Sequence, residues 1–320
     1  MARHPHSVKR RLKLSQERFL ADLSDASKPI SASRLADLSG LSRDEVSLFR
    51  RAWAEVEPER RRKIAAKLAD LAEDNFDLDF EAVFRICLSD SDEAVRLKAI
   101  EGLWGCEERF LIEPLVQLLK HDKAQSVRAT AASALGTFAL LAELEKLRPA
   151  DSGRVEAALL SAIRDPDETV EVRRRALEAV SALSRPEVAE LIHKAYASGQ
   201  HQMRIGALYA MGRNCDPIWL ALLVKELGSS DPEIRFEAAR ACGELGDRRA
   251  VPHLIPMLHD PDTEVQVAAV TALGQIGGDE AKQELERCLQ HTDSRLREAA
   301  EAALEEIGFA EEPLSFPAER

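Results

Sequence analysis

The sequence predicts an all-α protein, an α-solenoid of stacked antiparallel helix pairs, and two observations lead to this prediction. The first is one helix pattern that recurs at a fixed interval. Arg204, Arg235, Gln266 and Arg297 stand 31 residues apart at the same position of this pattern. The second is a composition with only 5% aromatic residues in 320, which is typical of helix-on-helix packing. One helix pair cannot bury its apolar side alone, so successive pairs must stack.

An arginine and the apolar positions after it define the repeat. The arginine position recurs at Arg96, Arg128, Arg173, Arg204, Arg235, Gln266 and Arg297. Alanine stands three residues after it every time, and a larger apolar residue such as Leu273 or Cys242 stands seven residues after it. Offsets 3, 4, 7 and 10 fall on one side of a helix with 3.6 residues per turn, so we expect this side to be buried.

A second amphipathic helix precedes each of these helices. Several of these first helices open with proline, which the first helical turn tolerates. The connections "DPDETV", "SSDPEI" and "HDPDTEV" offer aspartates that can cap the following helix. The unit is therefore helix, short turn and helix.

Proline in the first helix, aspartate in the turn and "V/I-R-x-x-A-x-x-A-L" in the second helix resemble HEAT repeats. They resemble in particular the short phycobilin-lyase HEAT-like kind. The segments "LDFEAVFRICLSDSDEAVRLKAIEGLWG" and "IRFEAARACGELG" also look like those of uncharacterised bacterial HEAT-repeat domain-containing proteins. The resemblance implies that each repeated arginine pairs with turn carboxylates of a neighbouring repeat. For function it implies a binding surface and no particular partner.

The predicted organisation has four parts: a basic arm over 1–24, a divergent helical cap over 25–77, seven HEAT-like repeats over 78–308 and a tail over 309–320. The one irregular step of the repeat points to an insertion near 141–153. Its "LRPADSG" segment contains turn-forming residues, so we expect a loop that projects from one edge of the solenoid.

Charge is distributed unevenly along the chain. Residues 1–63 carry a net charge of +6, and the whole chain carries −12. Residues 1–14 of the arm are therefore a candidate for binding nucleic acid, acidic lipid or the acidic remainder of the protein itself. Within 31–50, the residues Ala36, Gly40 and Val46 are spaced as in a DNA-binding helix-turn-helix. Ser42 and Glu45 form an ordinary capping box instead, so the segment either reads DNA or caps the solenoid.

No motif in the sequence indicates a catalytic, cofactor-binding or metal-binding site, so we predict that the protein has none of these sites. The eight histidines are never followed by glutamate, whereas deoxyhypusine hydroxylase holds iron with His-Glu dipeptides. The alkylpurine DNA glycosylases line their concave surface with basic residues, and this repeat region is acidic. Five cysteines without a C-x-x-C pair indicate no disulfide framework or zinc site. The sequence has no run of 18 apolar residues, so we expect no transmembrane segment. The first residues lack the apolar core of a secretion signal and the cysteines indicate no disulfides, so we expect a cytoplasmic protein.

A partner-binding surface is predicted where the second helices line the concave side of a solenoid. Offsets 2, 5 and 9 should face outward there, and in the middle repeats they comprise Lys98, Glu101, Arg175, Glu178, Tyr209, Arg213, Glu237, Arg240 and Glu244. Tyrosine and arginine are favoured interface anchors. The leading hypothesis is a non-catalytic scaffold or adaptor that binds a protein through this surface. The alternatives are a phycobilin-lyase-like or other modifying enzyme, and nucleic-acid binding through the basic N-terminal region.

Overall fold

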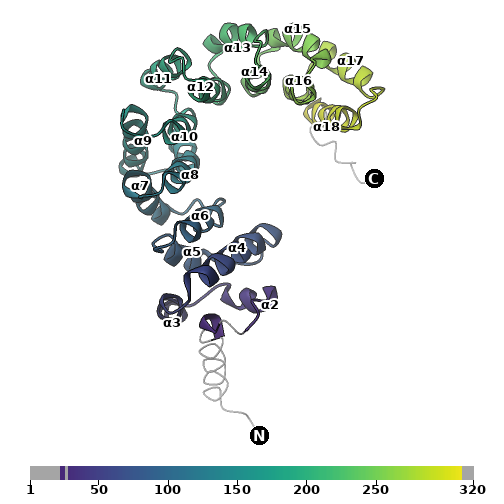
Figure 1. The fold of residues 1–320 in the computed structure, drawn as a ribbon. Coiled ribbons are helices and arrows are strands. Elements are labelled where there is room, and N and C mark those ends of the chain that lie inside the picture. Colours follow the sequence, from purple (N-terminus) through teal and green to yellow (C-terminus); the bar gives the residue numbers. More distant parts are fainter. Residues whose placement is uncertain (1–21, 26–27, 312–320) are drawn as a thin grey trace, which may run out of the picture. The chain divides into compact units, whose positions relative to one another are not determined.

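The computed structural model describes residues 22–25 and 28–311 (Figure 1). The arm at 1–14 and the end of the predicted tail lie outside these residues. Within them the regular elements are helices, and the fold is the all-α solenoid that the sequence predicts. None of these helices combines the length and the apolar composition that a membrane crossing needs. The chain divides into two compact units, unit 1 over 1–134 and unit 2 over 135–320, and each is described by itself.

Unit 1 contains paired helices that follow a short N-terminal segment. Its elements are α2 (Ala32–Leu35), η1 (Ala36–Leu38), α3 (Arg43–Ala54), α4 (Pro58–Asp74), α5 (Glu81–Cys87), α6 (Glu93–Glu101), η2 (Arg109–Leu111), α7 (Ile112–His121) and the first half of α8 (Gln125–Glu143). The second helix α4 packs against the next second helix, α6. Its buried residues Ile64, Ala65 and Leu68 repeat the apolar pattern of the later second helices.

The helix-turn-helix-like segment is tied to the first repeat. Gly40 adopts a φ of 63° and donates its backbone N–H to the carbonyl oxygen of Asp79 at 2.7 Å. Asp79 donates its own N–H to the hydroxyl of Ser39 at 2.9 Å. The predicted capping box is present, because the backbone N–H of Ser42 donates to the Glu45 carboxylate at 2.8 Å. These contacts attach the segment to the residues that precede α5.

Unit 2 consists of successive helix pairs (Figure 1). The first positions hold α9 (Pro149–Arg164), α11 (Pro186–Tyr196), α13 (Leu220–Glu226) with η3 (Pro217–Trp219), α15 (Val251–Leu254) with η4 (Arg248–Ala250) and η5 (Ile255–His259), and α17 (Asp279–Cys288). The second positions hold α10 (Val170–Val180), α12 (His201–Asn214), α14 (Pro232–Leu245), α16 (Thr263–Ile276) and α18 (Ser294–Glu311). Each second helix packs against the next one.

The apolar register of the second helices is as predicted. The offset-3 alanines, Ala238 among them, are fully buried. Cys242 at offset 7 is also buried, and this burial raises the pKa of its thiol to about 12, so it is a small core residue. The turn aspartates cap the second helices, as Asp231 and Asp262 do by accepting backbone N–H groups of Glu233 and Glu264.

A glycine at offset 8 brings neighbouring second helices of unit 2 into backbone contact. A Cβ added to Gly212 would lie 2.8 Å from Cα of Ala241 in the next second helix. One added to Gly243 would lie 2.8 Å from Cα of Ala272. The same arrangement joins Gly274 to Ala303. Glycine is required here because a side chain would separate the helices. We call these contacts the glycine ladder.

The expectation of a projecting loop near 141–153 is wrong. The additional residues lengthen α8, which reaches Glu143, and α9, which already begins at Pro149. Pro149 occupies the first turn of α9, where its fixed φ favours a helical start. Asp151 in the same turn is buried. Residues that were expected to form a turn therefore start a helix.

The repeated arginines pair as the resemblance implies in several repeats. Arg96 donates to both oxygens of Asp122 at 2.6 and 2.8 Å. Arg204 donates to the buried Glu226 carboxylate at 2.5 Å. Several also bond to the turn that precedes their own helix, as Arg297 does through the carbonyl oxygen of His291 at 2.7 Å. These arginines hold the turns of the scaffold in place.

Candidate functional site

The centre of the predicted binding surface is a stacked pair in unit 2. Tyr209 on α12 and Arg240 on α14 come from consecutive second helices, and the guanidinium carbon of Arg240 lies 4.7 Å from the centre of the Tyr209 ring. Arg240 also donates to the Glu244 carboxylate at 2.8 Å. Both side chains are half-buried. The pair presents an aromatic surface and a cation whose conformation is fixed by neighbours.

A second charged cluster lies on α10. Arg175 bonds to Glu178 at 3.1 Å and to Glu171 at 2.9 Å. Arg174, which the sequence reasoning did not select, bonds to the same two glutamates, and its distance to Glu178 is 2.8 Å. The stem of Arg174 crosses α12 at Gly206, where an added Cβ would lie 2.6 Å from Cγ of Arg174. The lack of a side chain at this position therefore leaves room for Arg174.

Glu237 is buried, and the expectation that it faces outward is wrong. Only 7% of the residue is exposed. The pKa of Glu237 is raised to about 7, mainly by burial, with a smaller contribution from the nearby Glu178 and Glu244 and against the opposing effect of Arg240 and Arg174. No described residue donates a hydrogen bond to its Oε1 atom, which lies 3.6 Å from Nη1 of Arg240.

The structure brings together most of the predicted unit 2 residues. Tyr209, Glu237, Arg240 and Glu244 form one group of contacts. Arg175 and Glu178 form another, and the electrostatic effect of Glu178 on Glu237 links the two groups. Arg213 at the end of α12 is exposed. The surface is thus a set of charges that are already paired within the chain.

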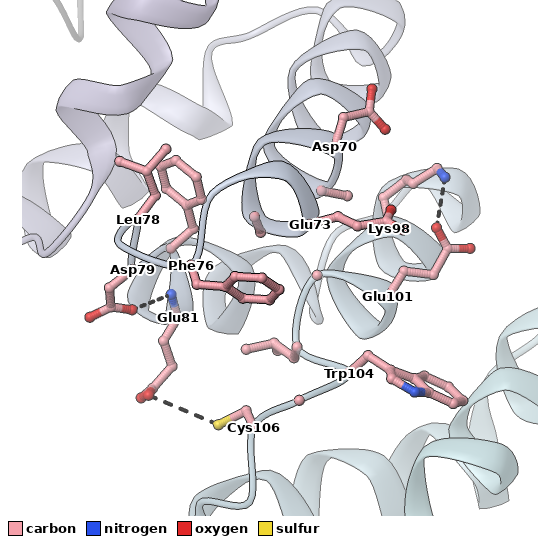
Figure 2. A pocket seen from close by; sticks show the side chains of 16 residues that line it. Asp70, Glu73, Phe76, Leu78, Asp79, Glu81, Lys98, Glu101, Trp104 and Cys106 are labelled. Atoms are coloured by element: carbon pink, nitrogen blue, oxygen red, sulfur yellow. Dashed lines mark hydrogen bonds and ion pairs between the residues drawn. The ribbon is translucent and has the colours of Figure 1, made fainter. Parts of the chain in front are cut away.

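The two predicted residues of unit 1 lie elsewhere on that unit's second helices. Lys98 on α6 donates to Glu101 at 2.6 Å. Both residues line a pocket of about 810 Å³ that α4, α5 and α6 enclose with their connecting turns (Figure 2). The pocket also contains Phe76 and Trp104, which the sequence reasoning did not select. Trp104 stands at offset 8 from Arg96, where three later repeats have the ladder glycines Gly212, Gly243 and Gly274.

Several arginines near the N-terminus form ion pairs or hydrogen bonds within the chain. Arg34 bonds to Asp22 at 3.0 Å, and Arg62 bonds to Asp92 at 2.8 Å. Arg60 donates to the carbonyl oxygen of Lys28 at 3.0 Å. Within residues 22–25 and 28–311, no group of three or more histidine, cysteine, aspartate or glutamate side chains is arranged to hold a metal ion.

The repeat geometry agrees with a comparison to known families. The family model described as HEAT repeats matches residues 81–157 and 220–305, which together exceed half of the chain. The chain belongs to the HEAT-repeat family. In this HEAT-repeat protein the first matched range contains α5 to α8, and the second contains α14 with Arg240, α16 and most of α18. Tyr209 on α12 lies between the two matched ranges.

Solved structures with similar chains include an engineered protein, Northeast Structural Genomics Consortium target OR329, with 25% identity over 62% of this chain and 96% of that one, at a TM-score of 0.40. The YibA protein of Escherichia coli has 19% identity over 88% and 98% of the two chains, at a TM-score of 0.46. The complex of CpcE and CpcF of phycocyanin lyase from Nostoc sp. PCC7120 has 18% identity over 71% of this chain and 94% of that one, at a TM-score of 0.47. At these TM-scores the likenesses assign no activity to this HEAT-repeat protein. No curated protein matches the sequence.

Proposed function

We propose that the protein is a non-catalytic HEAT-repeat scaffold that binds a protein partner through the face of its second helices. The observation that carries the proposal is the stack of Arg240 on Tyr209 at 4.7 Å, with Glu244 holding the same guanidinium. Tyrosine and arginine are the residue types that most often dominate binding energy at protein interfaces. Because neighbours already fix this pair, a partner would lose less side-chain entropy on binding it.

The paired charges around the stack favour a protein partner over a nucleic acid. Glu178 and Glu244 place carboxylates beside Arg175 and Arg240 in this part of unit 2. Phosphate groups would be repelled by them, whereas a protein surface of mixed charge could complement both signs. Arg34, Arg60 and Arg62 are engaged within the chain. The nucleic-acid alternative therefore depends on residues 1–14 and on the exposed arginines of α3, which are Arg43, Arg50 and Arg51.

The test begins with the partner that co-purifies in a fixed ratio with the native protein, and then measures its affinity by calorimetry. Tyr209→Ala and Arg240→Ala should each cost about 1 kcal/mol or more of binding free energy. Arg249→Ala is the matched control, because it removes an exposed guanidinium that pairs with Asp247 away from the stack. Leu223→Ala is the stability control, since Leu223 is fully buried in α13 and its truncation should lower the unfolding midpoint.

The result is unambiguous in either direction. Loss of affinity in the two stack variants, with unchanged unfolding midpoints and normal binding by Arg249→Ala, supports the proposal. Wild-type affinity in the double variant Tyr209→Ala/Arg240→Ala would show that the partner does not use this face.

A further inference from the structure

The unit 1 pocket arises where the repeat pattern is interrupted. Helix α6 ends at Glu101, so the chain from Gly102 to Cys106 forms a turn at the place where later second helices continue. Gly102 permits this turn to pass over the ring of Phe84, because an added Cβ would lie 2.3 Å from that ring. The turn and the end of α4 enclose the space of about 810 Å³.

Two aromatic side chains are exposed in this pocket. Phe76 is 95% exposed and Trp104 is 56% exposed, and they are the two aromatic members of the exposed large hydrophobic residues in the described part of the chain. Both belong to the lining of the same pocket (Figure 2). Exposed apolar surface that gathers at one concave place, with a polar rim, is typical of an interaction site.

The rim of the pocket is acidic. Its carboxylates belong to Asp70, Glu73, Asp79, Glu81 and Glu101, and Figure 2 shows their side chains around the two aromatic residues. The single cation of the lining is Lys98, which Glu101 already holds at 2.6 Å. Burial raises the pKa of Glu81, and the charges of Asp79 and Glu108 raise it further. Asp79 and Glu81 therefore repel each other, and a cation placed beside them would relieve this repulsion.

We infer that the Phe76–Trp104 pocket binds a segment of a protein partner that presents an arginine or lysine side chain beside an apolar one. The cation is attracted by the acidic rim and by the faces of the aromatic rings, while the apolar side chain covers the exposed ring surface. This inference rests on the proposed function, because it takes the partner to be a protein. An acidic or nucleic-acid ligand is disfavoured by the same rim.

The fluorescence of Trp104 can be used to test this inference. The sequence contains three tryptophans, and Trp53 and Trp219 are buried whereas Trp104 is exposed. Collisional quenching of tryptophan fluorescence in the full chain therefore reports on Trp104. The positively charged quencher caesium should act more strongly than iodide at low salt, and Glu73→Gln should reduce this difference.

Three hexapeptides serve as probes: alternating arginine and leucine, alternating glutamate and leucine, and alternating arginine and serine. We expect the arginine–leucine peptide to protect Trp104 from acrylamide, and its dissociation constant to rise about tenfold in Phe76→Ser, with fluorescence of Trp104 still present. Ile218→Ala is the matched control, because Ile218 is 58% exposed and lies in unit 2. Equal protection by the glutamate–leucine or arginine–serine peptide, or protection by none at millimolar concentration, would overturn the inference.

The native partner separates this inference from the proposed function. If the wild-type protein retains the partner and the variant Phe76→Ser/Trp104→Ala retains it equally well, the pocket inference fails and the scaffold proposal stands. If no protein partner binds the wild type, the scaffold proposal fails, and the peptide measurements still decide the chemistry of the pocket. Reduced retention by the pocket variant and normal retention by Ile218→Ala support both.

Discussion

Arg235 in one repeat and Asp260 in the next are joined by two parallel hydrogen bonds. Nε of Arg235 donates to Oδ2 at 2.7 Å, and Nη2 donates to Oδ1 at 2.8 Å. The remaining nitrogen, Nη1, donates to the carbonyl oxygen of Ser229 at 2.9 Å. Both side chains are nearly buried. One guanidinium therefore fixes the turn of its own repeat and the turn of the following repeat.

We expect Arg235→Gln to destabilise the protein by about 3 kcal/mol, because it leaves the buried Asp260 carboxylate without its cation. Glutamine can keep the bond to the turn carbonyl, as Gln266 does with the carbonyl oxygen of Asp260 at 2.6 Å. The measurement is urea denaturation followed by circular dichroism. Arg249→Gln, which loses only an exposed pair with Asp247, should leave the midpoint unchanged. Equal midpoints for wild type and Arg235→Gln would contradict the prediction.

Alanine substitutions at two helical glycines should change stability in opposite directions, because Gly243 belongs to the glycine ladder and Gly153 does not. Gly243→Ala should destabilise by about 1–3 kcal/mol, since the new Cβ meets the backbone of Ala272 and α14 and α16 must separate. Gly153→Ala should stabilise by about 0.5–1 kcal/mol, because Gly153 lies within α9 and its Cβ would meet open space. Thermal and urea unfolding of both variants measure these changes. A stabilising effect of Gly243→Ala would show that the two helices are not in backbone contact.

The raised pKa of Glu237 predicts that the stability of the protein depends on pH. Its pKa is raised from 4.5 to about 7 in the folded protein, so the folded state binds the proton more tightly than the unfolded state. The contribution of Glu237 is therefore most favourable below about pH 4.5, declines as the pH rises to about 7, and is constant above that. Glu237→Gln removes this decline, and we expect it to be about 1–3 kcal/mol more stable than wild type at pH 8.

The difference between Glu237→Gln and wild type should shrink by about 1 kcal/mol between pH 8 and pH 6. Glu286→Gln is the control, since Glu286 is exposed on α17. Urea midpoints at both pH values give the comparison. A difference that stays constant between the two pH values would mean that Glu237 keeps its charge throughout this range.

The repeat register was predictable from sequence because it depends on the spacing of apolar residues along single helices. The offset-3 alanines and the capping aspartates such as Asp262 follow from that spacing and from local backbone chemistry. The glycine ladder was also visible, since Gly212, Gly243 and Gly274 share one offset. The shared offset does not by itself indicate that these glycines contact the next helix, because that contact depends on how the helices pack.

The burial of Glu237 and the pocket were not predictable in the same way. A helical register assigns Glu237 to a face, but its burial depends on side chains of another helix, and Arg174 and Glu178 of α10 are close enough to affect its pKa. The pocket depends on where α6 ends, and the departure of Trp104 from the glycine position was its only signal. Pro149 likewise looked like a turn former, and only its place in a first helical turn shows that it starts α9.

The glycine ladder also determines how unit 2 can be deformed. Where Gly212, Gly243 and Gly274 press against the alanines of the next helix, no further approach of these helices is possible, because backbone atoms are already in contact. A motion that separates them breaks side-chain contacts and hydrogen bonds between repeats, such as those of Arg235 with Asp260. The ladder therefore sets a minimum separation of these helices, which no bending of unit 2 can reduce.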